Sequence, residues 1–254
     1  MAKQSGIIKL EGTIGDISFY KSKDGYLARS KGGVDKSRIE NDPAFQRTRE
    51  NGSEFGRAGS AGRSLRTAIR PLLLKSADSR VTSRLTQEMM KVIQADSTSV
   101  RGERNVLNGD LSLLSGFEFN KNSSLGATLY VPYSASIERV SGNAAVEIPA
   151  FVPLNNVIAP QGATHFKFVS AGAEVNFEDG TFKLVTSSST EIAIGTQTED
   201  ATTLTNALPA ASTLALFLVF GIEFYQQVNA SFYPLNSGSY NALAIVSVDV
   251  PAAG

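Results

Sequence analysis

Ser18 and Lys21 are the first residues of the chain whose types and spacing could do chemistry. They form a Ser-x-x-Lys pattern, the spacing at which penicillin-recognising enzymes hold their nucleophile. That chemistry requires both side chains on one face of a helical turn. The surrounding residues alternate at the strand period instead, which would put Ser18 and Lys21 on opposite sides. The companion motifs are absent from the sequence, so we expect no catalytic residue here.

Patterns for phosphate, metal or other acid–base chemistry are also missing. Neither glycine-rich phosphate-loop motif occurs, so turns explain the N-terminal glycines. The sequence has no cysteine and a single histidine, His165, which excludes cysteine-ligated metals and histidine metal clusters. The pairs Glu178/Asp179 and Glu199/Asp200 lie in predicted turns and lack the density of a calcium loop. We therefore expect a protein that is not an enzyme and has no cofactor or metal.

Arginine is the residue type whose distribution is most informative. Residues 1–107 carry 20 Lys and Arg against 12 Asp and Glu, whereas residues 108–254 carry 4 against 12. The two halves therefore have formal charges of +8 and −8, although the whole chain is neutral. This asymmetry indicates either a polyanionic partner for the first half or head-to-tail attraction between copies. Two solvated surfaces that do not interact are the alternative.

Nucleic-acid binding through segment 29–104 is the main rival to self-association. Twelve of the thirteen arginines fall in this segment, and arginine binds phosphate well. No helix-turn-helix, zinc-finger or aromatic RNA-binding pattern is present. Acidic residues also interrupt the arginines, and arginine is equally favoured at protein interfaces.

The first thirty residues have the pattern of a β-meander. Apolar residues recur every second position, which predicts strands over 6–11, 15–21 and 25–30, and Asp24-Gly25 predicts a hairpin turn. So small a sheet exposes one apolar face and needs cover from elsewhere. The residues expected to form a self-association interface are Ile8, Leu10, Ile17, Phe19, Tyr20, Tyr26, Arg47, Arg49, Arg57 and Arg63.

Three helices are predicted in the next segment, over 43–57, 60–75 and 80–96. Asp42-Pro43 is typical of a helix start, and Pro71 is expected to kink the second helix or end it early. The third helix has apolar residues at Val81, Leu85 and Met89, which share one face.

Beyond about residue 108 the sequence predicts many short strands. They are expected over 116–120, 126–133, 144–151, 164–169, 173–178, 181–187, 191–195, 213–226, 230–233 and 242–250. Asp179-Gly180 and Asn229 predict hairpin turns. The fold class is therefore α+β: a basic domain over 1–107, with the meander and a short helical segment, and an acidic antiparallel β-sandwich over 108–254. The spacing of the strands suggests an immunoglobulin-like or fibronectin-like plan.

Two stretches of sequence resemble a known family. Residues 12–59 (GTIGDISFYKSKDGYLARSKGGVDKSRIENDPAFQRTRENGSEFGRAG) and 220–248 (FGIEFYQQVNASFYPLNSGSYNALAIVSV) resemble an uncharacterised protein family of Bacteroidota, particularly flavobacteria. Its members begin with a similar glycine-rich hairpin followed by an arginine-rich run. The resemblance implies a bacterial origin but no activity, ligand or site residue.

From these observations we expect a structural protein that assembles with copies of itself or with a related subunit. A filament, an appendage and a virion-like shell are all compatible with this expectation. A carbohydrate- or ligand-binding sandwich is a third alternative, based on fold analogy alone. No apolar run is long enough to span a membrane, and no secretory signal is recognisable. We therefore expect a cytoplasmic protein on synthesis, which becomes extracellular or particle-associated only through a non-classical route or cell lysis.

Overall fold

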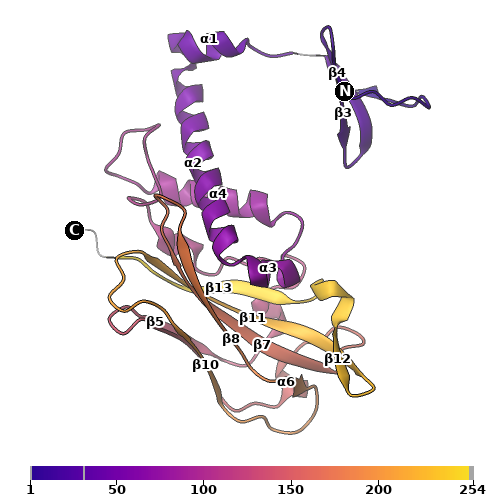
Figure 1. The fold of residues 1–254 in the computed structure, drawn as a ribbon, viewed down its shortest axis with the longest axis vertical. Coiled ribbons are helices and arrows are strands. Elements are labelled where there is room, and N and C mark those ends of the chain that lie inside the picture. The colour runs from indigo at the N-terminus through magenta and orange to yellow at the C-terminus, as the bar shows by residue number, and fades with distance from the viewer. Residues whose placement is uncertain (1, 31, 252–254) are drawn as a thin grey trace. The chain divides into compact units, whose positions relative to one another are not determined.

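The structure is a computed structural model that describes residues 2–30 and 32–251 (Figure 1). The chain divides after Glu50 into two units, so we call residues 2–50 the N-terminal unit and residues 51–251 the C-terminal unit. This division differs from the predicted boundary after residue 107. The difference arises because the helices within residues 51–107 bury their apolar side chains in the same core as the strands that follow them.

Four antiparallel strands pair in the order β1-β4-β3-β2 within the described residues of the N-terminal unit. They are β1 (Ala2–Lys3), β2 (Gly12–Ile14), β3 (Ile17–Ser22) and β4 (Gly25–Ser30). The strands predicted over 15–21 and 25–30 are confirmed, and Gly25 adopts φ +105° at the predicted turn. After this sheet come the helix α1 (Lys36–Asn41) and the 3₁₀ turn η1 (Pro43–Phe45).

The strand predicted over residues 6–11 is wrong, because a side chain binds the backbone there. Gln4 Oε1 accepts a hydrogen bond from Leu10 N at 2.8 Å, and Gln4 Nε2 donates to Leu10 O at 3.2 Å. Lys9 Nζ also donates to Gln4 O at 2.6 Å. These bonds close residues 4–10 into a loop, so the segment does not continue the sheet.

The helical segment is more continuous than its glycines suggest. A single helix, α2 (Gln46–Ala68), replaces the predicted break near residue 58. Glycine lowers helix propensity, but burial of Ala58, Ala61 and Leu65 against the C-terminal core supplies the missing stability. Pro71 lies in the first turn of α3 (Arg70–Ser76), where its missing N–H costs nothing. The helix α4 (Val81–Gln94) confirms the third predicted helix.

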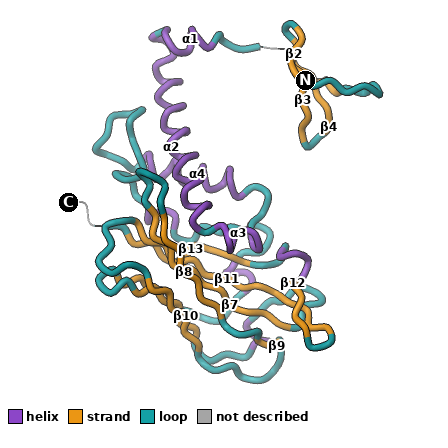
Figure 2. The backbone as a smooth tube through the Cα atoms, in the orientation of Figure 1, coloured by secondary structure: helices purple, strands orange, loops and turns teal. Residues whose placement is uncertain are grey.

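The described residues of the C-terminal unit contain two antiparallel sheets (Figure 2). The large sheet has six strands: β7 (His165–Val175), β8 (Phe182–Ser188), β9 (Ile192–Ala193), β11 (Ala215–Val228), β12 (Ser231–Pro234) and β13 (Ala242–Asp249). The small sheet has three strands, β5 (Ser134–Glu138), β6 (Asn143–Ile148) and β10 (Thr202–Ala207), in the order β10-β6-β5. Short helical turns connect them: η2 (Leu111–Leu114), α5 (Leu125–Thr128), α6 (Pro153–Asn156) and η3 (Leu235–Gly238).

Several strand predictions for this half need correction. β7 is one strand where two were predicted, because Ala171, Gly172 and Ala173 pair without interruption with β11. The predicted strand 126–133 is wrong, since α5 occupies its start. At 116–120 a single bridge between Glu118 and Ala244 replaces the predicted strand. The strands β5 and β10 were not predicted, because Ser, Thr and Asn dominate their sequences.

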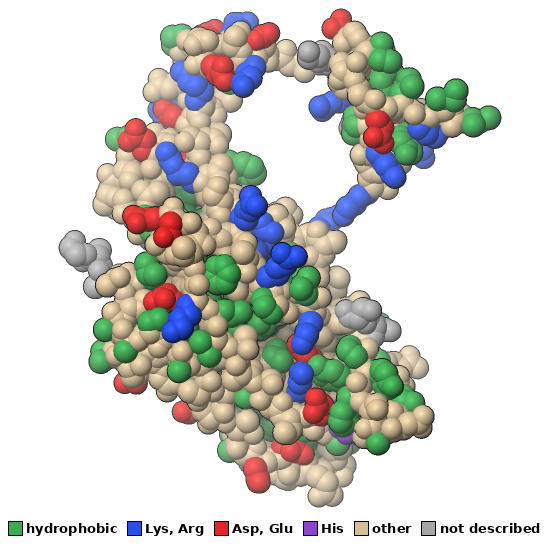
Figure 3. Space-filling view, in the orientation of Figure 1, with side chains coloured by type: hydrophobic (Ala, Val, Ile, Leu, Met, Phe, Trp, Pro, Cys, Tyr) green, Lys and Arg blue, Asp and Glu red, His purple; other side chains and the backbone are tan. Residues whose placement is uncertain are grey.

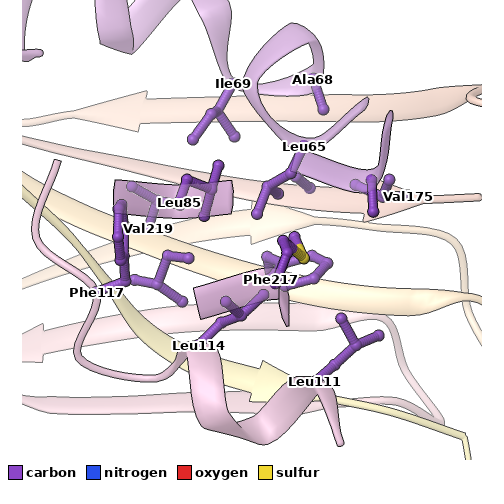
Figure 4. Packing of buried hydrophobic residues seen from close by; sticks show 14 of the residues in the cluster. Leu65, Ala68, Ile69, Leu85, Leu111, Leu114, Phe117, Val175, Phe217 and Val219 are labelled. Atoms are coloured by element: carbon purple, nitrogen blue, oxygen red, sulfur yellow. The ribbon is translucent and has the colours of Figure 1, made fainter. Parts of the chain in front are cut away.

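Apolar clusters cover both faces of the large sheet. On one face, Phe217 and Val219 of β11 pack with Leu65 and Leu85 of α2 and α4, as Figure 4 shows. On the other face, the intervening β11 residues, such as Phe220, pack with the small sheet. The C-terminal unit therefore has three layers: helices, large sheet and small sheet. This arrangement of helices and antiparallel sheets confirms the α+β class.

Candidate functional site

The N-terminal sheet has one apolar face. The strand register places Ile14 opposite Ile17, Phe19 opposite Ala28, and Lys21 opposite Tyr26. Residues that face each other across an antiparallel pair lie on the same side of the sheet. We call Ile14, Ile17, Phe19, Tyr26 and Ala28 the apolar face; Lys21 lies on the same side, with its Nζ 5.5 Å from the centroid of the Tyr26 ring. Ile14 and Ile17 are 64% and 46% exposed.

The opposite face of this sheet is mixed: Tyr20 pairs there with Leu27, among polar side chains. Ser18 lies there, opposite Arg29 and within 3.3 Å of the hydroxyl of Thr13. The guanidinium of Arg29 stacks over the Tyr20 ring at 5.5 Å from its centroid. Tyr20 was predicted to share an interface with Phe19, but the two side chains lie on opposite faces, so one flat contact cannot include both. Ser18 and Lys21 also lie on opposite faces, as expected, and do not form a catalytic pair.

The loop closed by Gln4 presents two isoleucines at its tip. Ile7 is 101% exposed and Ile8 is 81% exposed, and both are held by the hydrogen bonds at the base of the loop. Leu10, at the base, is 41% exposed. The predicted interface residues Ile8 and Leu10 therefore lie beside the sheet rather than in its apolar face.

Three of the four arginines predicted at the interface are bound within the chain. Arg47 forms an ion pair with Glu50 at 2.9 Å. Arg49 donates to the backbone carbonyls of Ile39 and Asp42 at 2.7 and 3.0 Å. Arg57 donates to the carbonyls of Gly102 and Arg104 at 2.6 and 3.0 Å. These side chains stabilise local structure, which leaves fewer guanidinium donors for a partner.

Arg63 belongs to a different group, together with Arg66 and Arg70. The three side chains line a shallow groove of about 420 Å³ whose other walls include Leu73 and Leu74. Among the described residues none provides these guanidinium groups with a hydrogen bond or an ion pair. We call this feature the arginine groove; basic side chains gather over α2 on the face shown in Figure 3. Arg66 and Arg70 were not among the predicted interface residues, although their spacing from Arg63 by three and seven residues places all three on one helical face.

Other charged groups in the C-terminal unit have structural roles. Glu54 is 1% exposed and accepts hydrogen bonds from Arg104 at 2.7 Å and from Gly102 N at 2.8 Å. The Arg104 side chain, followed by this backbone bond, holds the pKa of the Glu54 carboxyl below its usual value. Burial opposes ionisation of Asp96, but hydrogen bonds from Ser99 and Thr98 outweigh it and lower its pKa. Both carboxylates fasten the loop 96–105, so neither is available for catalysis.

A small cavity of about 190 Å³ beside β7 contains charges that neutralise one another. Glu223 is 3% exposed and lies 3.5 Å from Lys75 Nζ and 3.7 Å from Lys167 Nζ. Tyr225 donates its hydroxyl to Glu223 at 2.5 Å. Burial, and then this hydrogen bond, raises the pKa of Tyr225. Every charged group at this position already has a partner, so the cavity offers no free acid or base.

His165 and the acidic turns show no arrangement for metal binding. The imidazole Nδ1 of His165 lies 2.9 Å from the hydroxyl of Thr164, and its ring packs edge-on against Phe232. Asp179 accepts a hydrogen bond from Thr181 N at 2.8 Å, as a turn residue does. Within residues 2–30 and 32–251, no group of three His, Cys, Asp or Glu side chains is placed to hold a metal ion. The helices within these described residues are each too short or too polar to span a bilayer.

Comparison with protein-family models, curated proteins and solved structures gives no match to this chain. The comparisons therefore assign no family to the chain, and the resemblance of residues 12–59 and 220–248 to a Bacteroidota family stays a prediction.

Proposed function

We propose that the protein is a non-enzymatic structural protein that assembles with copies of itself through its N-terminal sheet. One observation carries the proposal: none of the described residues between 2 and 50 is buried. The strand register nevertheless collects Ile14, Ile17, Phe19 and Tyr26 on one face. A sheet of this size is marginal in water unless its apolar face is covered, so association with another molecule would stabilise it.

The chemistry of the apolar face suits a protein partner. Phe19 and Tyr26 are the large, rigid side chains that most often anchor protein interfaces. The isoleucine loop adds a second apolar projection at Ile7 and Ile8, which a partner could accommodate in a cleft. Contiguous exposed apolar groups of this kind are typical of interaction sites rather than of free surfaces.

The opposite charges of the two halves support a copy of the same chain as the partner. A contact between unlike surfaces of identical subunits is heterologous, and it propagates into a ring or a filament. For the C-terminal unit we propose an immunoglobulin-like or fibronectin-like sandwich, supported by the apolar layer between its large and small antiparallel sheets. That layer would stabilise the C-terminal unit, while the N-terminal sheet would form the contact between copies.

Light scattering after size-exclusion chromatography, with negative-stain imaging, tests the proposal. We expect the full chain to form ordered assemblies that grow with protein concentration. The variant Phe19→Ser should remain dispersed, because it removes the central anchor of the apolar face. Tyr20→Ser is the matched control on the opposite face and should assemble as the unchanged chain does. A full chain that stays monomeric at high concentration, or a Phe19→Ser variant that assembles normally, would refute the proposal.

A further inference from the structure

The guanidinium groups of the arginine groove have no hydrogen-bond acceptor among the described residues. Arg63 and Arg70 are exposed, and the Nε of Arg66 is buried with no hydrogen-bond partner. Arg66 as a whole is half-buried and lines the groove, so an incoming oxygen would bind the accessible part of its guanidinium. Guanidinium groups bind carboxylates especially well because their donors match both oxygens.

The walls of the groove indicate that its ligand is a polypeptide. Leu73, Leu74 and Val81 line it beside the arginines, and Leu74 is 74% exposed. Apolar walls of this kind would contact a side chain of the ligand. The groove lining contains no aromatic side chain on which a nucleic-acid base could stack. A protein surface that combines carboxylates with apolar groups fits this chemistry better than a phosphate backbone.

The same chain carries a surface of that composition at one end of the small sheet. Glu147 pairs in register with Thr203, and Glu199 bridges Phe151, so Glu147, Glu199 and Asp200 lie at the same end. A shallow groove there is lined by Glu147, Pro149 and Ala201. We call this feature the acidic end. Glu147 and Asp200 are exposed, and no ion pair within the described residues involves these three carboxylates.

The two surfaces lie on different layers of the C-terminal unit. The arginine groove is formed by the helices that cover one face of the large sheet, whereas the acidic end belongs to the small sheet that covers the other. Two layers separated by a sheet cannot close on each other within one copy. A head-to-tail contact between copies would pair the arginine groove of one copy with the acidic end of the next.

We infer that the arginine groove binds the acidic end of a second copy of this chain. The inference rests on the proposed self-assembly and adds to it a second contact, made by residues outside the N-terminal sheet; ordered assembly requires both contacts. Each copy then has one free groove and one free acidic end, so the contact repeats. Three guanidinium groups meet three carboxylates, and the apolar walls meet Pro149 and Ala201.

A charge-swap experiment in the full chain tests this inference. One variant carries Arg63→Glu and Arg70→Glu, and the other carries Glu147→Lys and Asp200→Lys; all four positions are exposed, so the core is not disturbed. Since like charges would then face each other, we expect each variant alone to associate about tenfold or more weakly than the unchanged chain. Mixing the two variants should restore association, because each supplies the charge that the other lost. Circular dichroism confirms that both variants are folded.

The outcomes separate the inference from the proposed function. If the unchanged chain does not associate, the proposed function fails. If it associates but neither charge variant changes the association, or mixing restores nothing, the inference is wrong while the role of the N-terminal sheet stands. If the unchanged chain retains nucleic acid that the arginine variant loses, and the two chains assemble equally, the groove binds phosphate and the inference is also overturned.

Discussion

Two hairpins with the same turn signal behave differently in this protein. The β3–β4 hairpin turns at Asp24-Gly25 and the β7–β8 hairpin at Asp179-Gly180, and both glycines adopt positive φ angles. In β7, residues Phe166 to Ala173 are almost all buried between two apolar clusters, whereas no residue of β3 or β4 is buried. Local turn chemistry is therefore sufficient to specify a hairpin, but its stability depends on what covers it.

The difference between the two hairpins is part of a wider contrast in burial, because the C-terminal unit has a buried core whereas none of the described residues between 2 and 50 is buried. In the C-terminal unit the phenylalanines of β7 and β11 are fully buried, each contributing roughly 2–3 kcal/mol. The N-terminal unit has no such contribution among its described residues. Matched substitutions in the two units should therefore have unequal effects.

Replacing a phenylalanine should change the free energy of unfolding in the C-terminal unit but not in the N-terminal unit. Phe217→Ala leaves a cavity under α2 and α4 and should lower the free energy of unfolding by about 3–5 kcal/mol. Phe19→Ala should leave that free energy unchanged, because its half-buried side chain lies outside both apolar clusters of the C-terminal unit. Urea unfolding followed by circular dichroism, at a concentration too low for assembly, measures both. Equal losses would mean that the N-terminal sheet is part of the folded core.

Loss of a carboxylate should also have unequal effects. Glu54→Gln removes the buried carboxylate that pairs with the half-buried Arg104 and should cost about 2–4 kcal/mol in urea unfolding. Glu40→Gln removes an exposed ion pair with Lys36 and should cost less than about 0.5 kcal/mol. A small effect at Glu54 would show that the loop 96–105 does not need this anchor.

Acidification should destabilise the C-terminal unit first. The pKa values of Glu54 and Asp96 are lower in the folded chain than in the unfolded chain. Their contribution to stability is therefore complete above the unfolded pKa of about 4 and is lost as the pH falls toward the folded values. We expect the urea concentration at the unfolding midpoint, measured between pH 7 and pH 3, to decrease once the pH is below about 4. Asp96→Asn should reduce this fall, and a midpoint that does not change with pH would contradict the assignment.

The two turn glycines provide the finest comparison. Gly180→Ala and Gly25→Ala each force a side chain into a positive φ, which costs about 1 kcal/mol. For Gly180 the loss should appear in global unfolding. For Gly25 it should appear only as weaker assembly, since the hairpin is not part of the cooperative core. If Gly25→Ala lowered the free energy of global unfolding, the N-terminal sheet would have to unfold together with the C-terminal unit.

The sequence predicted the features that depend on local chemistry. The three hairpin turns and the amphipathic α4 were recognisable from residue types and spacing. It did not predict β5 or β10, whose polar strands form because β6 pairs with both of them. The continuity of α2 across its glycines likewise depends on a sheet that is distant in sequence.

The sequence predicted part of the candidate site, namely most of the residues that form the apolar face of the N-terminal sheet. Ile17, Phe19 and Tyr26 follow the strand period, and the structure places them on one face. Two errors came from contacts that periodicity does not reveal. Gln4 closes residues 4–10 into a loop, where a strand was predicted over 6–11. Arg49 and Arg57 donate hydrogen bonds to backbone carbonyls of the same chain. Which arginines are free depends on the fold around each side chain.

Hydrogen exchange of the backbone amides in residues 12–30, measured over a range of protein concentrations, shows whether a second copy covers the N-terminal sheet. If a second copy covers the apolar face, these amides should exchange rapidly in dilute protein and become protected as the concentration rises. Amides of β7 serve as the internal reference and should be protected throughout. Protection of residues 12–30 that is already complete in dilute monomer would show that the chain covers its own sheet, which would contradict the account.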